Sequence, residues 1–281
     1  MSAGSYHFRL GDFECVSISD GTNDYSLGLF FANAPKAEAE AALRDHGLPT
    51  NEIITPYTEL VVQTGEHRVL VDMGAGHLGE NTGRLETNMR AAGIDPADID
   101  TVFITHAHRD HIGGTLDAHG QLVYPNACYH IWKGEWDFWF SDKESAVVPP
   151  FRVEAARRAL EPLRDRVELL QTEGEVLPGI GVLAAPGHTP GHMVVTVSSG
   201  AEQLLYIGDT VLHHLHLEHT DWTPVFDILP EQAQTSKQRI FDLAADTKAW
   251  VIGQHFIPFP SLGHVVKWGT GWQWQPIETD S

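Results

Sequence analysis

Residues 105–111 read THAHRDH and place four potential metal ligands within six positions: His106, His108, Asp110 and His111. The apolar run TVFIT (101–105) that leads into them is typical of a buried strand, so we expect a loop at a strand end. Alternating side chains in such a loop can converge, with His106 and His108 facing one metal ion and Asp110 and His111 a neighbouring one. Neutral imidazole and carboxylate are ligands that zinc prefers. The stretch therefore predicts a metal site.

Three further candidates lie downstream in short motifs. His192 closes PGHTPGH (186–192), Asp209 lies in LLYIGDT (204–210), and His255 lies in WVIGQHF (250–256). Each follows or borders an apolar β-type segment, as expected when loops at strand ends build a site on a rigid scaffold.

The order HxHxDH, then His, Asp and His resembles the metallo-β-lactamase-fold hydrolases over most of the chain. VLVDMGAG (69–76) is similar to that family's early strand-turn motif, which implies that Asp72 supports the site from behind the ligands. The resemblance implies an α/β chain folded as an αββα sandwich, with the metal site at one edge of its two sheets. It also implies two sets of ligands: His106, His108 and His192 for a first ion, Asp110, His111 and His255 for a second, and Asp209 bridging both.

Other segments resemble one branch of that superfamily. The branch contains methyl parathion hydrolase, and quorum-quenching N-acyl homoserine lactonases are similar to it in the same core motifs. The segments are GDFECVSISDGT (11–22), PYTELVVQTGEHRVLVDMGAG (56–76), HIWKGEWDFWF (130–140) and HFIPFPSLGH (255–264). They favour the branch without choosing among esters, lactones and phosphotriesters.

Composition narrows the class of protein. Ligands spread from His106 to His255 must meet in one place, so we expect residues 1–281 to form a single domain. Apolar content of 42% is ordinary for a globular protein. No apolar run reaches the roughly 18 to 20 residues of a membrane span, and no secretory signal is readable, so we expect a cytoplasmic protein without a membrane partner.

Cys15 and Cys128 are too few for a disulfide framework, and we expect both to be small buried residues.

The formal charge of −20 limits the partners. A nucleic-acid-binding protein needs basic surface to neutralise phosphates, so we expect no nucleic-acid partner. The charge also disfavours strongly anionic substrates, although bound metal ions can offset it locally. Adaptation to a saline environment and simple solubility both remain open as its cause.

Apolar periodicity gives the expected elements. Helices are predicted at 34–47, 84–92, 151–165 (kinked or ended by Pro162) and 231–245, with another helical stretch after Gly114. Strands are predicted at 13–19, 59–63, 69–72, 101–105, 182–185, 194–197, 203–207 and 249–253.

These observations predict a hydrolase with two divalent ions per chain. Zinc is the expected metal, and manganese, cobalt and iron are alternatives. A metal-bridging hydroxide would cleave neutral lactones or esters, with phosphotriesters as a side activity. Asp110 is expected to orient the hydroxide or pass a proton to the leaving group, besides binding metal. The chain has no Gly-x-Ser-x-Gly elbow that would indicate a serine hydrolase.

Three alternatives stay open. The main activity could be that of a methyl parathion-type organophosphate hydrolase. It could also be thioester or sulfur chemistry, as in glyoxalase II or the persulfide dioxygenases, although a site for anionic glutathione needs basic residues that are few here. Finally, the chain could bind metal without turnover. A homodimer is left open.

Several side chains can be given either a structural or a functional role. His188 is interpreted as a support for its loop. The histidines of HHLHLEH, namely His213, His214, His216 and His219, are expected on a partly exposed loop rather than at a third metal or a substrate wall. The aromatic residues at 132–140 are expected in core packing or a dimer contact, with a hydrophobic substrate wall as the alternative. For Trp268, Trp272 and Trp274 the same choice stays open.

Overall fold

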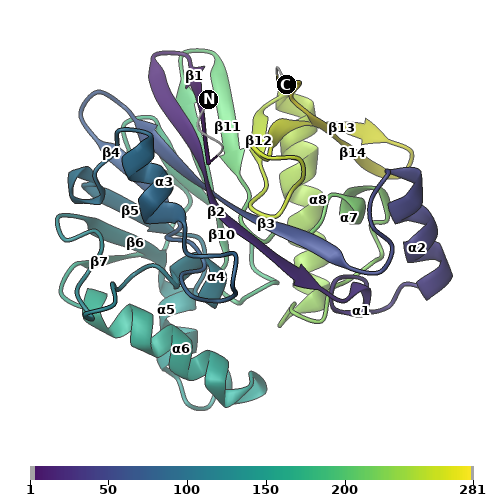
Figure 1. Cartoon of the computed structure of the whole chain (residues 1–281), viewed down its shortest axis with the longest axis horizontal. Helices are drawn as coiled ribbons and strands as arrows, with labels where there is room; N and C mark the ends of the chain where they lie inside the picture. The colour runs from purple at the N-terminus through teal and green to yellow at the C-terminus, as the bar shows by residue number, and fades with distance from the viewer. Residues whose placement is uncertain (1–3, 280–281) are drawn as a thin grey trace.

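The computed structural model describes residues 4–279. Its strands form two seven-stranded sheets that lie between outer layers of helices (Figure 1). The first sheet has the order β1 (Ser5–Leu10), β2 (Phe13–Tyr25), β3 (Ile53–Gln63), β4 (Arg68–Val71), β5 (Thr101–Ile104), β6 (Cys128–Trp132) and β7 (Val167–Leu170). The second has the order β14 (Gly271–Pro276), β13 (Leu262–Trp268), β12 (Trp250–Ile252), β11 (Glu202–Tyr206), β10 (Met193–Ser199), β9 (Ile180–Ala184) and β8 (Gly174–Leu177).

Helices cover the outer faces of both sheets (Figure 1). The helices of the described residues are α1 (Leu27–Phe30), α2 (Lys36–Asp45), α3 (Leu85–Ala91), α4 (Arg109–Ile112), α5 (Lys133–Phe140), α6 (Pro150–Leu160), α7 (Leu215–Glu218) and α8 (Pro230–Thr247), of which α4 lies at the sheet edge rather than on an outer face. Short 3₁₀ turns occur at Pro96–Asp98, Ser145–Val147 and Glu161–Leu163. No helix within residues 4–279 combines the length and apolar character needed to cross a membrane.

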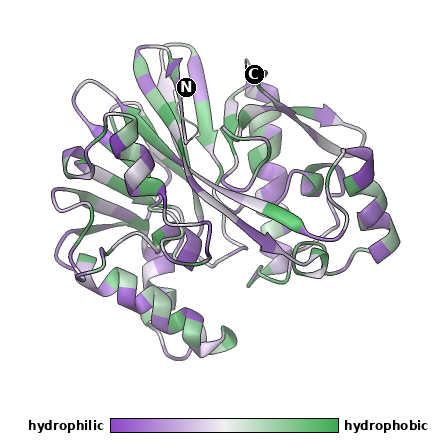
Figure 2. Cartoon of the chain, viewed as in Figure 1, coloured by the Kyte–Doolittle hydropathy of each residue, from purple (hydrophilic) through white to green (hydrophobic). Residues whose placement is uncertain are grey.

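Three apolar layers hold the sheets and their helices together, and a smaller fourth cluster lies around α1 and α2. Leu60, Val71 and Phe103 of the first sheet meet Val195 and Tyr206 of the second in a core between the sheets. A second core lies under α3 and α5, on the outer face of the first sheet, and a third lies under α8. Hydrophobic residues alternate with hydrophilic ones along the outer helices (Figure 2), as expected when one helix face is buried. The predicted αββα sandwich is confirmed.

Strand direction determines where the site lies. Strands β4, β5, β6 and β7 run parallel to one another, and β11 runs parallel to β12. The carboxyl ends of parallel strands emerge at one edge, where loops can converge on a ligand. Residues 105–111 leave β5 at that edge, Asp209 follows β11, and His255 follows β12.

Most predicted elements are confirmed within a few residues, with informative exceptions. Helix α6 ends at Leu160, just before Pro162, as the proline requires. Strands β2 and β3 are longer than predicted, because the polar residues 20–25 stay paired with β3 past an irregularity between Ser19 and Gly21. The helical stretch expected after Gly114 is absent from residues 115–127, which form turns around an isolated bridge between Leu116 and Leu122.

The expectation of a partly exposed loop at 213–219 is wrong for most of that segment. His213, His214 and His216 are 3%, 6% and 1% exposed, and residues 215–218 form α7. Phe31 packs against the rings of His213 and His216, which explains why this polar sequence is buried.

Core packing is confirmed for most of the aromatic residues. Trp136, Phe138 and Trp139 of α5 belong to the core under that helix. Trp272 and Trp274 are buried beneath α8, whereas Trp268 is 59% exposed.

Candidate metal centre

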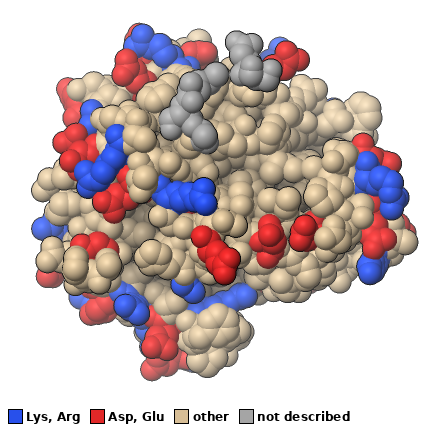
Figure 3. Space-filling view, viewed as in Figure 1, with Lys and Arg blue, Asp and Glu red and all other residues tan. Residues whose placement is uncertain are grey.

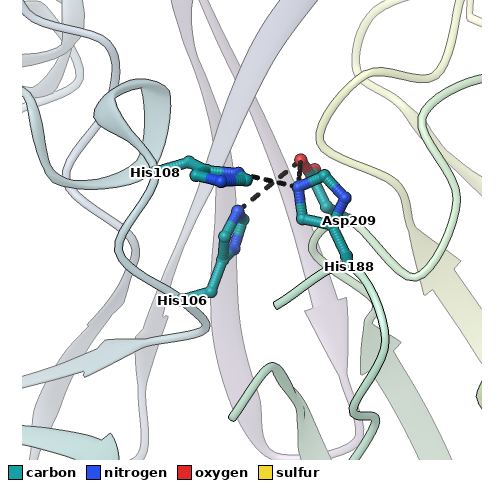
Figure 4. A group of neighbouring side chains, drawn as sticks. All are labelled: His106, His108, His188 and Asp209. Atoms are coloured by element: carbon teal, nitrogen blue, oxygen red, sulfur yellow. Dashed lines mark hydrogen bonds and ion pairs between the residues drawn. The ribbon is translucent and has the colours of Figure 1, made fainter. Parts of the chain in front are cut away.

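Two groups of potential metal ligands meet at the sheet edge and share one carboxylate, that of Asp209. Within each group the ligand atoms lie within 4.8 Å of one another. The first group is His106, His108, His188 and Asp209 (Figure 4), and the second is Asp110, His111, His255 and Asp209. Six of the seven side chains singled out from the sequence therefore come together, and His192 lies outside both groups.

The first group is built around Asp209. Its Oδ2 is 3.7 Å from Nε2 of His106 and 3.1 Å from Nε2 of His188. Nδ1 of His108 is 2.8 Å from Nε2 of His188. The three rings point toward one another from two separate loops (Figure 4).

The second group uses the other oxygen of the same carboxylate. Oδ1 of Asp209 is 3.3 Å from Nε2 of His111 and 3.1 Å from Nε2 of His255. Oδ2 of Asp110 is 3.4 Å from Nε2 of His255 and 3.9 Å from Nε2 of His111. Asp209 is thus placed to serve both groups.

Hydrogen bonds behind the second group fix its rings. Asp72 is fully buried, and its Oδ2 accepts a hydrogen bond of 2.7 Å from Nδ1 of His111. Its Oδ1 accepts from the backbone N–H of Thr105 at 2.8 Å. Nδ1 of His255 donates to the carbonyl oxygen of Pro56 at 2.9 Å. This is how proteins orient metal-binding histidines, so that Nε2 is presented to the metal, and Asp72 has the position that the resemblance implied.

The electrostatics of the two groups differ. Burial, together with the neighbouring His111, lowers the pKa of His106 well below its ordinary range. Burial also opposes charge on His111, but Asp209 and Asp72 outweigh it and raise its pKa well above the ordinary range. Asp209 keeps a pKa well below its usual value, because His255 and His111 outweigh the effect of its burial. A carboxylate that is ionised at neutral pH thus lies between the groups.

Divalent metal fits these residues. Nε2 of His106, His108 and His111, and Oδ1 of Asp209, are buried and have no hydrogen-bond partner within residues 4–279. An unpartnered buried polar atom costs free energy that a bound ligand removes. Three of these atoms converge, because Nε2 of His106 and Nε2 of His111 both lie within 3.7 Å of the Asp209 carboxylate, whereas His108 faces the first group through Nδ1. Imidazole nitrogens and a carboxylate oxygen match the donor set of zinc and related ions.

The loop at 186–192 carries two imidazoles with different surroundings. Nδ1 of His188 is 2.9 Å from Oδ1 of Asp227, and its Nε2 faces the first group. His192 is fully buried, its Nε2 accepts from the backbone N–H of Asp209 at 2.9 Å, and its Nδ1 lacks a partner among the described residues. His192 remains adjacent to the group, with its ring 5.1 Å from that of His106.

A cavity of about 820 Å³ opens over both groups. This volume lies in the range of small-molecule sites. His108, Asp110, Asp209 and His255 form part of its lining. Much of the remaining wall is apolar and comes from α1, α4, α6 and nearby loops: Phe30, Leu78, Ile112, Leu116, Phe151 and Phe226.

Comparison with known proteins identifies the family. The model of the metallo-beta-lactamase superfamily matches residues 60–255, which include both ligand groups. The chain belongs to this superfamily.

Two solved structures are similar to this chain over nearly its whole length. AidC, a dizinc quorum-quenching lactonase solved with its product, is 31% identical, with a TM-score of 0.93 and 99% of each chain covered. The hydrolase AbOPH is 28% identical, with a TM-score of 0.92 and 100% of each chain covered.

Curated relatives are more distant. An atrochrysone carboxyl ACP thioesterase of Claviceps purpurea is 29% identical over 154 residues, which are 55% of this chain and 39% of that protein. An N-acyl homoserine lactonase of Bacillus cereus is 25% identical over 124 residues, 44% of this chain and 43% of that protein. The chain spans about half the length or less of the curated relatives it matches.

One residue that the sequence did not reveal joins the two loops of the first ligand group. Glu135 of α5 is fully buried and accepts hydrogen bonds from the backbone N–H groups of Ala107 at 2.9 Å and Gly191 at 3.1 Å. It also accepts from Oγ1 of Thr189 at 2.5 Å and from Nε1 of Trp139 at 2.6 Å. Ala107 separates His106 from His108, and Thr189 and Gly191 lie between His188 and His192. A single carboxylate therefore sets the spacing of both loops.

Gly191 shows how closely α5 approaches the site. A Cβ atom at this position would lie 2.0 Å from the backbone nitrogen of Glu135, so no larger residue fits without moving the helix. A sequence signal for Glu135 does exist: it is a charged residue one helical turn before Trp139, on the buried side of an aromatic helix.

Proposed function

We propose that this chain is a dinuclear metal-dependent hydrolase that cleaves neutral lactones or esters, with phosphotriester cleavage as a weaker side activity. The observation that carries the proposal is the pair of ligand groups sharing Asp209 on the floor of a largely apolar cavity. We further propose that residues 1–281 act as one domain, because the ligands come from loops of both sheets.

The proposed ligands follow the two groups, except that His192 takes the place of His188 in the first. His106, His108 and His192 would hold the first ion, Asp110, His111 and His255 would hold the second, and Asp209 would serve both. His192 is included on the strength of the resemblance and of its unpartnered buried Nδ1. His188 then keeps its place between Asp227 and Asp209, where it orients the shared carboxylate.

When bound, two such ions supply a water-derived nucleophile at neutral pH and polarise the substrate oxygen. The chain contributes acid–base and orienting groups. The side chain of Asp110 is 21% exposed and reaches the cavity, so its carboxylate can take a proton from water or return one to the leaving group.

A pair of tyrosines provides an uncharged hydrogen-bond donor in the cavity wall. Tyr25 lines the cavity, and its hydroxyl is 2.7 Å from that of Tyr57. Burial, with the carboxylate of Asp110 nearby, raises the pKa of both hydroxyls, so both keep their protons at neutral pH. Tyr25 can therefore donate to a substrate carbonyl as negative charge develops on it.

The walls support a neutral substrate with an apolar arm. Phe30, Phe151 and Phe226 line the cavity above the ligand groups, and an acyl chain or aryl ring would bury its surface against them. The similarity to AidC, solved with N-hexanoyl-L-homoserine, favours an acyl lactone. On the face seen in Figure 3, acidic and basic side chains are interspersed among wide uncharged areas.

Thioester hydrolysis is the second candidate, because several curated relatives are thioesterases. Three arginines, Arg109, Arg152 and Arg158, line the cavity and could receive an anionic carrier. The guanidinium of Arg152, however, lies 5.2 Å from the ring centre of Phe226 and 5.9 Å from that of Phe151, so it also forms part of the aromatic wall.

Metal removal and reconstitution test the proposal. Chelator treatment should abolish lactone hydrolysis, and activity should return in proportion to added zinc, cobalt or manganese up to two equivalents per chain. Full activity in metal-free protein, or saturation at one equivalent, would refute the dinuclear proposal.

A further inference from the structure

A cluster of three different ligand types lies on the first sheet, outside both groups described above. Cys128 and His130 are two residues apart on β6, so their side chains project from the same face of the sheet. Glu168 of β7 is paired with His130 across the strands. The thiol, imidazole and carboxylate ligand atoms lie within 4.8 Å of one another.

The ring of His130 has a fixed orientation, and one of its nitrogens is free to bind a ligand. Its ring stacks on Phe103 of β5, with 4.8 Å between ring centres and 20° between planes, which fixes the ring orientation. The side chain is 5% exposed, and its Nδ1 is 3.7 Å from Oε2 of Glu168. Nδ1 is buried and has no hydrogen-bond partner within residues 4–279. Buried polar atoms almost always have a hydrogen-bond partner, so the unpartnered Nδ1 indicates a ligand at this position.

The cluster is also open to solvent. β7 is the last strand of its sheet, and the side chain of Glu168 is 66% exposed. Cys128 is partly exposed, which contradicts the expectation that both cysteines are buried, while Cys15 is 1% exposed. An ion can therefore reach the cluster, and a water molecule can complete its coordination.

We propose that Cys128, His130 and Glu168 form a further site for a divalent ion of the zinc class, independent of the centre around Asp209. In tetrahedral coordination at 2.0 to 2.3 Å, ligand atoms lie about 3.3 to 3.8 Å apart. For a nitrogen and an oxygen ligand this separation is about 3.3 to 3.5 Å, so the Nδ1 to Oε2 distance of 3.7 Å needs to shorten by only a few tenths of an ångström. Sulfur, nitrogen and oxygen donors together suit zinc and cobalt and exclude magnesium or calcium as good fits.

Binding releases the thiol proton to solvent, because the thiolate is the ligand. Burial and the neighbouring Glu168 raise the pKa of the Cys128 thiol, so affinity should increase with pH. A bound ion would link β7, an edge strand, to β6.

Cobalt absorption tests this site without reference to catalysis. Co²⁺ bound to thiolate gives an intense sulfur-to-cobalt charge-transfer band in the near ultraviolet, and the groups around Asp209 contain no sulfur. We expect this band when the full-length protein is titrated with Co²⁺. It should disappear in Cys128→Ser and persist in Cys15→Ser, the matched control.

The other two ligands are tested by affinity. His130→Gln and Glu168→Gln should each weaken Co²⁺ binding, followed by the same band, by more than about tenfold. Lactonase activity should be unchanged in Cys128→Ser, which also shows that the variant folds. Absence of the band in the native protein, its persistence in Cys128→Ser, or unchanged affinity in both glutamine variants would overturn the proposal.

Discussion

The carboxylate of Glu135 accepts a hydrogen bond of 2.9 Å from the backbone N–H of Ala107, between His106 and His108. All four of its hydrogen bonds come from donors, so a carboxamide at this position would turn an N–H₂ group toward some of them. We expect Glu135→Gln to bind the first metal about 10 to 100-fold more weakly, the usual effect of losing a group that orients metal ligands.

Metal retention during dialysis against a competing chelator measures this effect. Asp137→Asn is the matched control, because Asp137 lies on the same helix, is exposed, and contacts Lys133. If Glu135→Gln retains metal as well as Asp137→Asn does, the carboxylate does not position the loops.

Asp110 is expected to act in turnover as well as in binding. Asp110→Asn should reduce kcat by at least about 100-fold, the scale of lost acid–base help, in protein shown by elemental analysis to carry its full metal. Glu154→Gln, which changes another carboxylate of the cavity wall, should leave kcat nearly unchanged. Near-normal turnover in metallated Asp110→Asn would exclude the chemical role.

The roles proposed for the two histidines of the 186–192 loop can be tested separately. His192→Asn should lose the first ion, whereas His188→Asn should keep it and lose only the contacts to Asp209 and Asp227. Metal content of both variants after identical purification provides the comparison. Loss of an ion from His188→Asn alone would assign the ligand role to His188, as its position in the first group allows.

Lys237 gives a prediction about stability and pH. The side chain is buried on α8, and Nζ donates to the carbonyl oxygen of Thr220 at 2.6 Å. Burial lowers the pKa of Lys237 to about 8, against about 10.4 in an unfolded chain. Between these values the unfolded chain binds more protons than the folded one, so this residue makes the free energy of unfolding rise with pH.

Lys237→Met removes that dependence. The variant should gain stability relative to the native chain below about pH 8, offset by the lost hydrogen bond, and the gain should shrink by about 3 kcal/mol as pH rises to about 10.4. Denaturant unfolding of metal-loaded protein across this range measures the difference. Lys36→Met changes an exposed lysine and should show no such trend. A pH-independent difference for Lys237→Met would contradict the lowered pKa.

Local sequence patterns were sufficient to predict many of the strands and helices and most of the candidate metal ligands. The apolar run at 101–105 predicted β5, and the spacing of His106, His108, Asp110 and His111 predicted a convergence at its end, which the structure contains. Pro162 predicted the end of α6. These features depend on neighbours within a few residues, so they can be read from sequence.

Features that depend on distant partners could not be read in this way. Glu135 contacts Ala107, 28 residues away, and Gly191, 56 residues away, and nothing local distinguishes it from an exposed helical glutamate except its aromatic neighbours. Likewise, the polarity of 213–219 predicted exposure, whereas Phe31, far away in sequence, buries two of its histidines. Tertiary packing overrides local polarity at both places.

Substrate preference tests the central claim most directly. The measurement is kcat/KM for an N-acyl homoserine lactone, a phenyl ester, methyl parathion and a glutathione thioester, all with the same metal-loaded protein under one condition. The neutral substrates should lead, with the lactone or the ester highest and methyl parathion lower, because an apolar wall and a charge of −20 favour neutral acyl compounds. Highest activity on the thioester would contradict the account, and highest activity on methyl parathion would reassign the enzyme to phosphotriester hydrolysis.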